Sequence, residues 1–76
     1  MGSKYDLGSI VYPRIRYIMT VNDMSIRGLA SKTGMIHTTL MRKLNGKSRF
    51  YYEEAEKIAD ALNLSRNEIP WMMLRS

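Results

Sequence analysis

The fold is decided by residues 25–47, which read SIRGLASKTGMIHTTLMRKLNGK. Ser25 is a good N-cap residue, and the helix that follows it should end before Gly34. Because glycine adopts the left-handed conformation without steric cost, Gly34 predicts a sharp turn at that point. Leu40 and Leu44 lie one helical turn apart and share one face of a second helix. The stretch therefore predicts two short helices joined by a tight turn.

The second of these helices is predicted over residues 37–44, and the Asn-Gly pair at residues 45–46 ends it. Ala30 is small enough to let the first helix cross the second closely, and Leu40 anchors the second helix by its inner face. The N-terminal half of the second helix then remains exposed. This arrangement is the helix-turn-helix unit.

The rest of the chain also has helical periodicity. A first helix is predicted over residues 9–21 with Ser9 as its cap, and Pro13 stands in its first turn or marks its true start. A fourth helix is predicted over residues 52–63, with acidic residues in the first turn, where the helix dipole favours them. The apolar stripe of this helix consists of Tyr52, Ala55, Ile58, Ala59 and Leu62.

A short or broken fifth helix is predicted near the end of the chain. Ser65 and Glu68 have the spacing of a capping box, but Pro70 disfavours a helical conformation of Ile69. No segment shows the alternation of apolar and polar residues that is typical of a strand, and Val, Ile and Thr are sparse. The predicted fold is therefore all-α, a compact five-helix domain with a central helix-turn-helix.

Length and composition limit the protein to one small domain. The chain has 76 residues, no Cys and one His, which predicts a single domain over residues 9–76 and excludes disulfides and thiolate metal sites. Residues 1–8 are expected to form a tail, of which residues 1–3 can derive from cloning. The longest apolar run, residues 69–74, is far shorter than the roughly 20 residues of a membrane helix.

The net charge of +5 is unevenly distributed along the chain. Residues 25–49 carry six Lys or Arg side chains and no acidic one, whereas residues 53–69 carry five acidic and two basic side chains. A basic segment beside an acidic helix favours a polarised surface that faces a polyanion. A plain solvated face is the alternative, since separation along the chain need not become separation in space.

Several short motifs carry a family resemblance. They are Leu29-Ala30, Gly34-Met35, Thr38-Thr39-Leu40, Asn45-Gly46-Lys47, Ile58-Ala59 and residues 61–65. In these motifs the chain resembles the phage-repressor and Cro-like helix-turn-helix family, also called lambda-repressor-like or Xre-type, over residues 10–74. The resemblance implies a DNA-binding domain, commonly dimeric, whose third helix reads the major groove of a palindromic operator. It also implies a bacterial cytoplasmic location at the nucleoid.

Five positions depart from the family pattern. Ile26 stands where many members have a Gln that clamps a phosphate, so this clamp should be absent. Gly28 weakens its helix by roughly 1 kcal/mol relative to Ala. Ile36 and Tyr51 stand where Ser residues often cap the third and fourth helices. Lys43 replaces an apolar residue, and we expect it to snorkel or to lie exposed.

Carried onto this sequence, the resemblance assigns roles to two groups of residues. The expected base contacts come from the third helix and are His37, Thr38, Thr39, Met41 and Arg42. The expected phosphate contacts flank that helix or cap the one before it and are Ser25, Asn45, Lys47, Ser48 and Arg49. The apolar run of Trp71, Met72, Met73 and Leu74 is compatible with core packing, a dimer seam or a link to a second domain, and we expect a dimer seam because dense apolar patches are rarely left in water.

Other kinds of functional site have little support in the sequence. His37 has no partner residues for a metal or a catalytic triad, and the carboxylates Glu53, Glu56 and Asp60 are expected to form a solvated helix face. Base stacking by Phe50, Tyr51 and Tyr52 is less favoured than core packing of Tyr52 and loop packing or a DNA-backbone contact of Tyr51. We therefore expect no catalysis, cofactor, metal, membrane or small-molecule substrate.

The predicted function is a transcriptional regulator, most consistent with a phage or bacterial repressor that binds a duplex operator as a homodimer. One alternative is the antitoxin of a toxin–antitoxin pair, since antitoxins share this fold. The other is a protein-interaction module that has lost DNA binding. The acid-free residues 25–49 argue against the second alternative, because such a module has no need of Lys47 and Arg49.

Overall fold

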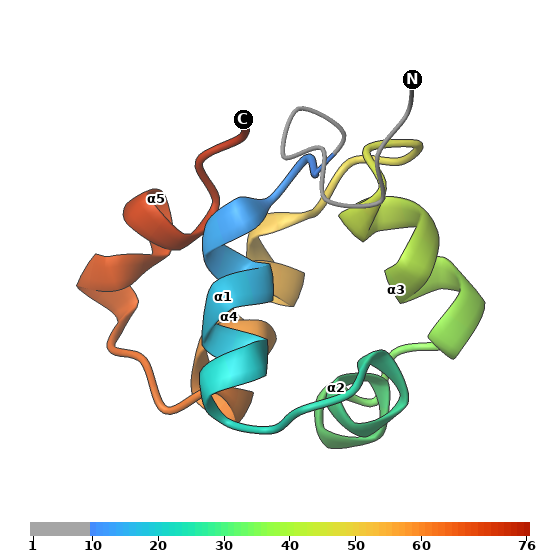
Figure 1. Ribbon diagram of the computed structural model, residues 1–76, viewed down its shortest axis with the longest axis horizontal. Coiled ribbons are helices and arrows are strands. Elements are labelled where there is room, and N and C mark those ends of the chain that lie inside the picture. The colour runs from blue at the N-terminus through green and yellow to red at the C-terminus, as the bar shows by residue number, and fades with distance from the viewer. Residues whose placement is uncertain (1–9) are drawn as a thin grey trace.

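A computed structural model describes residues 10–76 of the chain. The described residues form α1 (Pro13–Val21), α2 (Ile26–Thr33), α3 (His37–Leu44), α4 (Tyr52–Ala61), the 3-10 turn η2 (Arg66–Glu68) and α5 (Ile69–Met72). No strand occurs among them, so the all-α five-helix prediction is confirmed. Figure 1 shows α1 and α4 in the middle of the molecule, with α2 and α3 on one side and α5 on the other.

One small core joins all five helices. The fully buried side chains are Ile15, Leu29, Leu40, Leu44, Ile58 and Met72. Every helix supplies at least one of these side chains, so none of the helices is placed independently of the others. The core therefore fixes the orientation of α3. Within the described part of the chain, no helix is long and apolar enough to cross a membrane.

Helix α1 begins at Pro13, which confirms the alternative that this proline marks the true start and not the start at residue 9. Ser9, the predicted cap, lies outside the described residues. Tyr12 precedes the helix with φ −121° and ψ 75° and makes no side-chain capping bond. The physical reason is that proline has no N–H to donate and has a φ angle already suited to a helix, so it fits best at the first helical position.

The predicted packing at the start of α4 is wrong for Tyr52, whose side chain is 62% exposed. Phe50 takes the inner position instead and meets the ring of Tyr12 edge to face, with ring centroids 5.3 Å apart. The loop before α4 brings Phe50 to the core before the helix begins, which turns the first helical residue outward. Helix α4 also ends at Ala61, two residues before the predicted end.

The end of the chain is broken as predicted, into η2 and α5, but two details differ. Ile69 has a helical backbone, with φ −58° and ψ −46°, because burial of its side chain outweighs the influence of Pro70. Ser65 makes no capping hydrogen bond to the backbone, since its hydroxyl bonds the side chain of Asn67 instead. The capping box predicted from Ser65 and Glu68 is therefore absent.

Candidate nucleic-acid interface

The turn between α2 and α3 forms as the sequence predicts. Ser25 caps α2, and its Oγ accepts a hydrogen bond of 2.9 Å from the backbone N–H of Gly28. Gly34 ends α2 in the left-handed region, at φ 75°. The hydroxyl of Thr33 is buried and donates to the carbonyl of Leu29 at 2.8 Å, which satisfies its polar group inside the helix pair. These local bonds fix the angle at which α3 leaves the turn.

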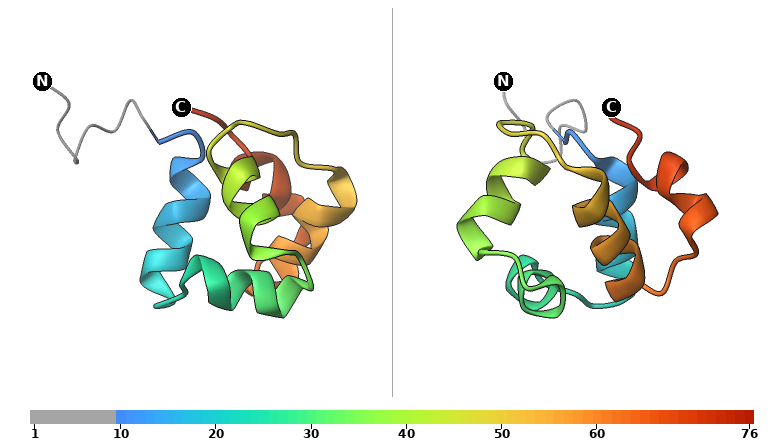
Figure 2. Two further views of the ribbon diagram at one scale, coloured as in Figure 1. Left: turned by 90° about the vertical axis from the view of Figure 1, so that its right-hand side faces the viewer. Right: turned by 180° about the vertical axis from the view of Figure 1, so that it is seen from behind.

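Helix α3 presents one face to the core and the other to solvent. Leu40 is 0% and Leu44 is 1% exposed, whereas Thr38 and Arg42 are exposed on the outer side. Figure 2 (left), which views the molecule from the α3 side, shows this helix in front, with α2 crossing below it. The other expected base contacts lie at the margins of the outer face and are half-buried: His37, Thr39 and Met41.

Lys43 is neither exposed nor snorkelling, so that prediction is wrong. The residue is 6% exposed, and its Nζ donates to both carboxylate oxygens of Glu54, at 2.6 Å each. The same carboxylate accepts the backbone N–H of Tyr51 at 2.8 Å. The ammonium of Lys43 also lies 4.8 Å from the centre of the Tyr51 ring. One of the six positive charges of residues 25–49 is therefore neutralised inside the protein.

The acid of this pair has a shifted pKa. Partial burial raises the pKa of Glu54, but the hydrogen bonds from Lys43 and the Tyr51 backbone, together with the positive charges of Lys43 and Lys57, outweigh burial. The net result is a pKa below the ordinary value of 4.5. The ion pair therefore stays charged at neutral pH, and it ties α3 to the start of α4.

The turn after α3 carries most of the expected phosphate contacts. Asn45, Lys47 and Arg49 are exposed and Ser48 is half-buried. Ser25, at the start of α2, is exposed as well. Four of these side chains thus follow the C-terminal end of α3, and Ser25 lies at the start of the preceding helix α2.

Two residues next to this surface were missed from the sequence. Ile36, directly before α3, is 70% exposed although it is apolar. Arg16, in α1, donates from Nη2 to Oδ1 of Asn45 at 3.4 Å. The spacing gave no signal for the exposure of Ile36, because this residue lies four positions before Leu40; it is exposed because it precedes the first residue of α3 and has an extended backbone. The position of Arg16 had no signal either, since it depends on how α1 packs beside α3.

The predicted dimer seam is only partly on the surface. Met72 is 0% exposed and belongs to the core, which corrects its place in the seam. Trp71 is 45% and Leu74 is 49% exposed, and Met73 is half-buried. The guanidinium of Arg14 lies 5.8 Å from the Trp71 ring. The surface part of the seam is thus limited to three side chains.

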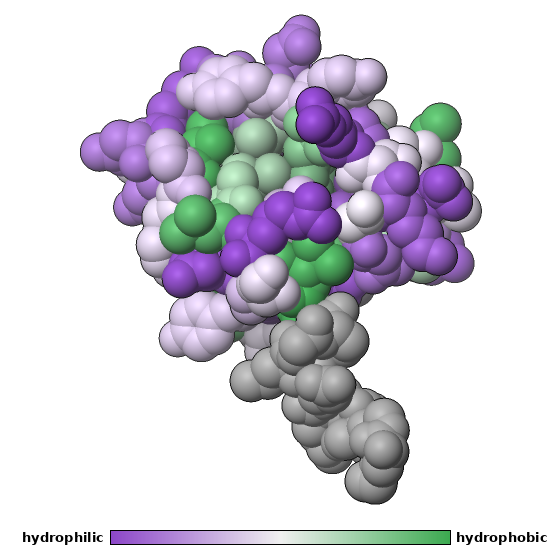
Figure 3. Space-filling view, turned by 90° about the horizontal axis from the view of Figure 1, so that it is seen from above, coloured by the Kyte–Doolittle hydropathy of each residue, from purple (hydrophilic) through white to green (hydrophobic). Residues whose placement is uncertain are grey.

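An apolar groove adjoins these residues. It measures about 340 Å³ and is lined by Phe50, Tyr51, Tyr52, Ala55, Ile69, Pro70 and Met73. Figure 3 looks onto the upper end of the molecule and shows hydrophobic residues in a hollow with hydrophilic residues around it. The groove lies between the start of α4 and α5.

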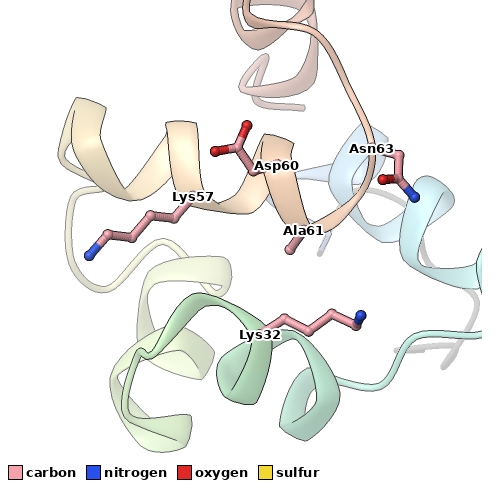
Figure 4. A pocket seen from close by; sticks show the side chains of 5 residues that line it. All are labelled: Lys32, Lys57, Asp60, Ala61 and Asn63. Carbon is pink, nitrogen blue, oxygen red and sulfur yellow. The ribbon is translucent and has the colours of Figure 1, made fainter.

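A second groove, of about 370 Å³, lies between α2 and α4 (Figure 4). Its polar side chains do not converge on one point: Lys32 and Lys57 extend in opposite directions, and Asp60 points away from both. Residues 10–76 contain no group of three His, Cys, Asp or Glu side chains that could hold a metal ion. The groove therefore has no arrangement suited to a catalytic or metal site.

Comparison with known proteins agrees with the fold. The structure is similar to the crystal structure of the restriction-modification controller protein C.AhdI from Aeromonas hydrophila, with a TM-score of 0.71 and 22% sequence identity, covering 86% of this chain and 98% of that one. No curated protein sequence matches the chain. The model of the Cro/C1-type helix-turn-helix DNA-binding domain matches residues 14–69, which is well over half of the chain. The chain belongs to the Cro/C1-type helix-turn-helix DNA-binding domain family.

Proposed function

We propose that the chain is a sequence-specific regulator of transcription, a repressor of phage or bacterial origin, which inserts α3 into the major groove of a palindromic operator. The observation that carries this proposal is the division of α3 into two faces. Leu40 and Leu44 hold the helix in the core, and Thr38 and Arg42 are exposed one turn apart on the opposite face. A helix held in this way can enter a groove without unpacking the domain.

Base readout is assigned to the outer face of α3 and its margins. Arg42 has a planar guanidinium that can donate two hydrogen bonds to a guanine, and Thr38 offers a hydroxyl and a methyl group. Three half-buried residues at the margins complete the proposed set, and they are His37, Thr39 and Met41. The buried pair of Lys43 and Glu54 supports this assignment, because it stabilises the rotation of α3 that turns Arg42 outward.

Phosphate contacts are assigned to the residues around α3 that carry donors without reaching the groove. They are Ser25, Asn45, Lys47, Ser48 and Arg49. Lys47 and Arg49 supply charge, and Asn45 and Ser48 can donate neutral hydrogen bonds to phosphate oxygens. The Oγ of Ser25 accepts the Gly28 N–H, which leaves its own hydroxyl hydrogen available as a donor.

The regulator is proposed to act as a homodimer through the surface part of the seam, Trp71, Met73 and Leu74. Their exposure supports this role, and so does the adjoining apolar groove between α4 and α5. Trp71 belongs to α5, which lies on the side of the molecule away from α3 (Figure 1), so self-association through α5 leaves α3 accessible. A two-fold symmetric dimer presents two such helices to half-sites about 10 bp apart.

A binding selection on random duplex DNA tests the proposal directly. The expected result is an enriched two-fold symmetric sequence whose half-site centres are about one helical turn, roughly 10 bp, apart. An enriched sequence without symmetry would contradict the proposed dimer, but it would still support sequence-specific DNA binding. Recovery of random sequences with no affinity above that for an anionic polymer would contradict the regulator and favour the protein-interaction module.

A further inference from the structure

Three cations from distant parts of the chain lie around the turn that follows α3. Lys47 belongs to the turn itself, Arg16 comes from α1, and Arg75 comes from the segment after α5. We call these three residues the turn cluster. Sequence spacing does not reveal the cluster, because its members are separated by long stretches of chain. It is created by the packing of α1 and of the C-terminal segment against the end of α3.

Arg16 reaches the turn from α1. Its Nη2 donates to Oδ1 of Asn45, and these two atoms lie 3.4 Å apart. Arg14, only two residues earlier, lies against Trp71 on another side of the same helix. Since residues two apart on a helix point in different directions, only Arg16 can extend toward α3. One guanidinium of α1 is thus added to the border of the proposed DNA surface.

Arg75 is brought to the same turn by a contact between the two ends of the described chain. The backbone N–H of Ser76 donates to the carbonyl of Val11 at 2.9 Å, and its hydroxyl donates to the carbonyl of Ile10. The guanidinium of Arg75 then lies 5.6 Å from the centre of the Tyr12 ring. These contacts hold the C-terminal segment beside the beginning of the domain.

Glycine at position 46 leaves the space that Arg75 uses. A methyl group placed on the Cα of Gly46 would lie 2.9 Å from Nη2 of Arg75, closer than such contacts normally are. The φ angle of 78° is what requires glycine at this position, since the end of the flexible Arg75 side chain could move away from a methyl group. The guanidinium of Arg75 is therefore directly against the turn, one residue before Lys47.

The cluster has no acidic partner among residues 10–76. The ion pairs of this part of the chain are Lys43 with Glu54 and Arg66 with Glu56, and neither involves the cluster. Three like charges around one short turn repel each other unless an anion lies between them. Guanidinium groups suit a phosphate in particular, because their N–H groups match its oxygen atoms in a bidentate way.

We infer that Arg16 and Arg75, together with Lys47, bind the DNA backbone beside the groove that α3 enters. The inference rests on the proposed DNA-binding function and adds to it two residues outside the helix-turn-helix. Since α3 ends at this turn, a phosphate held by the cluster would limit how far α3 can rotate or slide in the groove. Arg16 and Arg75 are thus positioning residues, and they contact no base.

The test measures the salt dependence of binding to a fluorescein-labelled duplex of random sequence, about 20 bp long, enough for two half-sites. The wild-type protein should lose affinity with a log–log slope of roughly −4 to −5 per monomer. Arg16→Gln and Arg75→Gln should each reduce the slope by about 0.9, which corresponds to roughly eightfold weaker binding at 0.1 M salt. Arg66→Gln is the matched control, because Arg66 is an exposed arginine paired with Glu56 on the α5 side.

The outcomes separate the inference from the function on which it rests. If the wild-type protein binds without salt dependence, the proposed function fails. If it binds with the expected slope while Arg16→Gln and Arg75→Gln behave as Arg66→Gln does, the turn cluster is wrong and the function stands. Arg16→Lys and Arg75→Lys keep the charge and should restore most of the slope. Equal losses in the lysine and glutamine variants would mean that the arginines act on the fold, and would overturn the inference.

Discussion

The Nζ atom of Lys43 lies 2.6 Å from both carboxylate oxygens of Glu54, and the side chains are only 8% and 21% exposed. Lys43 belongs to α3 and Glu54 to the first turn of α4. The carboxylate also accepts the backbone N–H of Tyr51, so one acidic group caps α4 and holds α3 at once. The pair therefore links the start of one helix to the rotation of the helix proposed to read DNA.

Removal of the acid from this pair should destabilise the domain more than removal of the base. Glu54→Gln leaves the ammonium of Lys43 buried without a charged partner, and we expect a loss of about 2–3 kcal/mol, less than for a fully buried pair because Glu54 is partly exposed. Lys43→Met leaves a carboxylate that is still bonded to the Tyr51 N–H, so it should cost less. Urea unfolding at pH 7 gives both values. The double variant Lys43→Met/Glu54→Gln should recover part of the loss, and a double loss equal to the sum would contradict the coupling.

The same carboxylate should make the domain sensitive to acid. The pKa of Glu54 is lowered on folding, so its charged form stabilises the folded state above the ordinary value of 4.5. This contribution is lost as the pH falls from that value through the lower pKa of the folded state. Thermal unfolding followed from pH 6 down to about pH 3 should show a steeper decline for the wild type than for Glu54→Gln. Parallel curves for the two proteins would show that Glu54 does not contribute in this range.

The turn between α2 and α3 offers a test of backbone strain alone. Gly34 has φ 75°, and no atom lies within 4 Å of the position a Cβ would take. Gly34→Ala should therefore cost roughly 1–2 kcal/mol without any steric clash. Gly34→Asn should cost less, because asparagine tolerates the left-handed conformation. Ser31→Ala, on the exposed side of α2, is the control and should leave the midpoint of unfolding within a few degrees. Equal effects of the alanine and asparagine variants would argue against a backbone origin.

Local features were predicted well from the sequence, because neighbouring residues determine them. The capping bond of Ser25 and the left-handed turn at Gly34 each depend on a few adjacent positions. The bounds of α3 were also predicted correctly, since Leu40 and Leu44 fix its inner face.

Features that depend on contacts between distant segments were not predicted. Lys43 lies three residues after Leu40, near the inner face of α3, but its charge argued against burial, and its partner Glu54 comes from another helix. Phe50, and not Tyr52, packs against the core. Which of the two aromatic residues faces inward depends on where the loop ends and α4 begins, and the sequence does not determine this position within two residues. Arg16 and Asn45 come together only when α1 packs beside α3.

The proposed seam predicts different effects for neighbouring residues of the C-terminal segment. Trp71→Ala and Leu74→Asp should weaken self-association while the domain stays folded. If these residues lie at the centre of the contact, each variant should lose at least about 1 kcal/mol of association free energy. Met72→Ala should instead lower the free energy of unfolding by roughly 2–5 kcal/mol, since Met72 is fully buried. Sedimentation and thermal unfolding of each variant separate the two effects. Val21→Asp, on an exposed apolar residue of α1, is the matched control. If it weakens association as much as Leu74→Asp does, the seam lies elsewhere.

Arg42 and Lys47 should differ in what their loss does to DNA recognition. Arg42 is exposed one turn after Thr38, opposite the buried Leu40, which directs its guanidinium toward the groove. A bidentate contact between arginine and guanine supplies about 1–3 kcal/mol of discrimination, so Arg42→Ala should remove the preference at one or two operator positions. Lys47 follows Gly46, after α3 has ended, and at this position its charge can contact only the phosphate backbone of the DNA. Lys47→Ala should weaken all duplexes equally and lower the salt slope by about one unit. The measurement compares both variants on the selected operator and on a scrambled duplex of the same composition. If Arg42→Ala weakens both duplexes by the same factor, Arg42 contacts phosphate, and α3 lies in the groove with a different rotation.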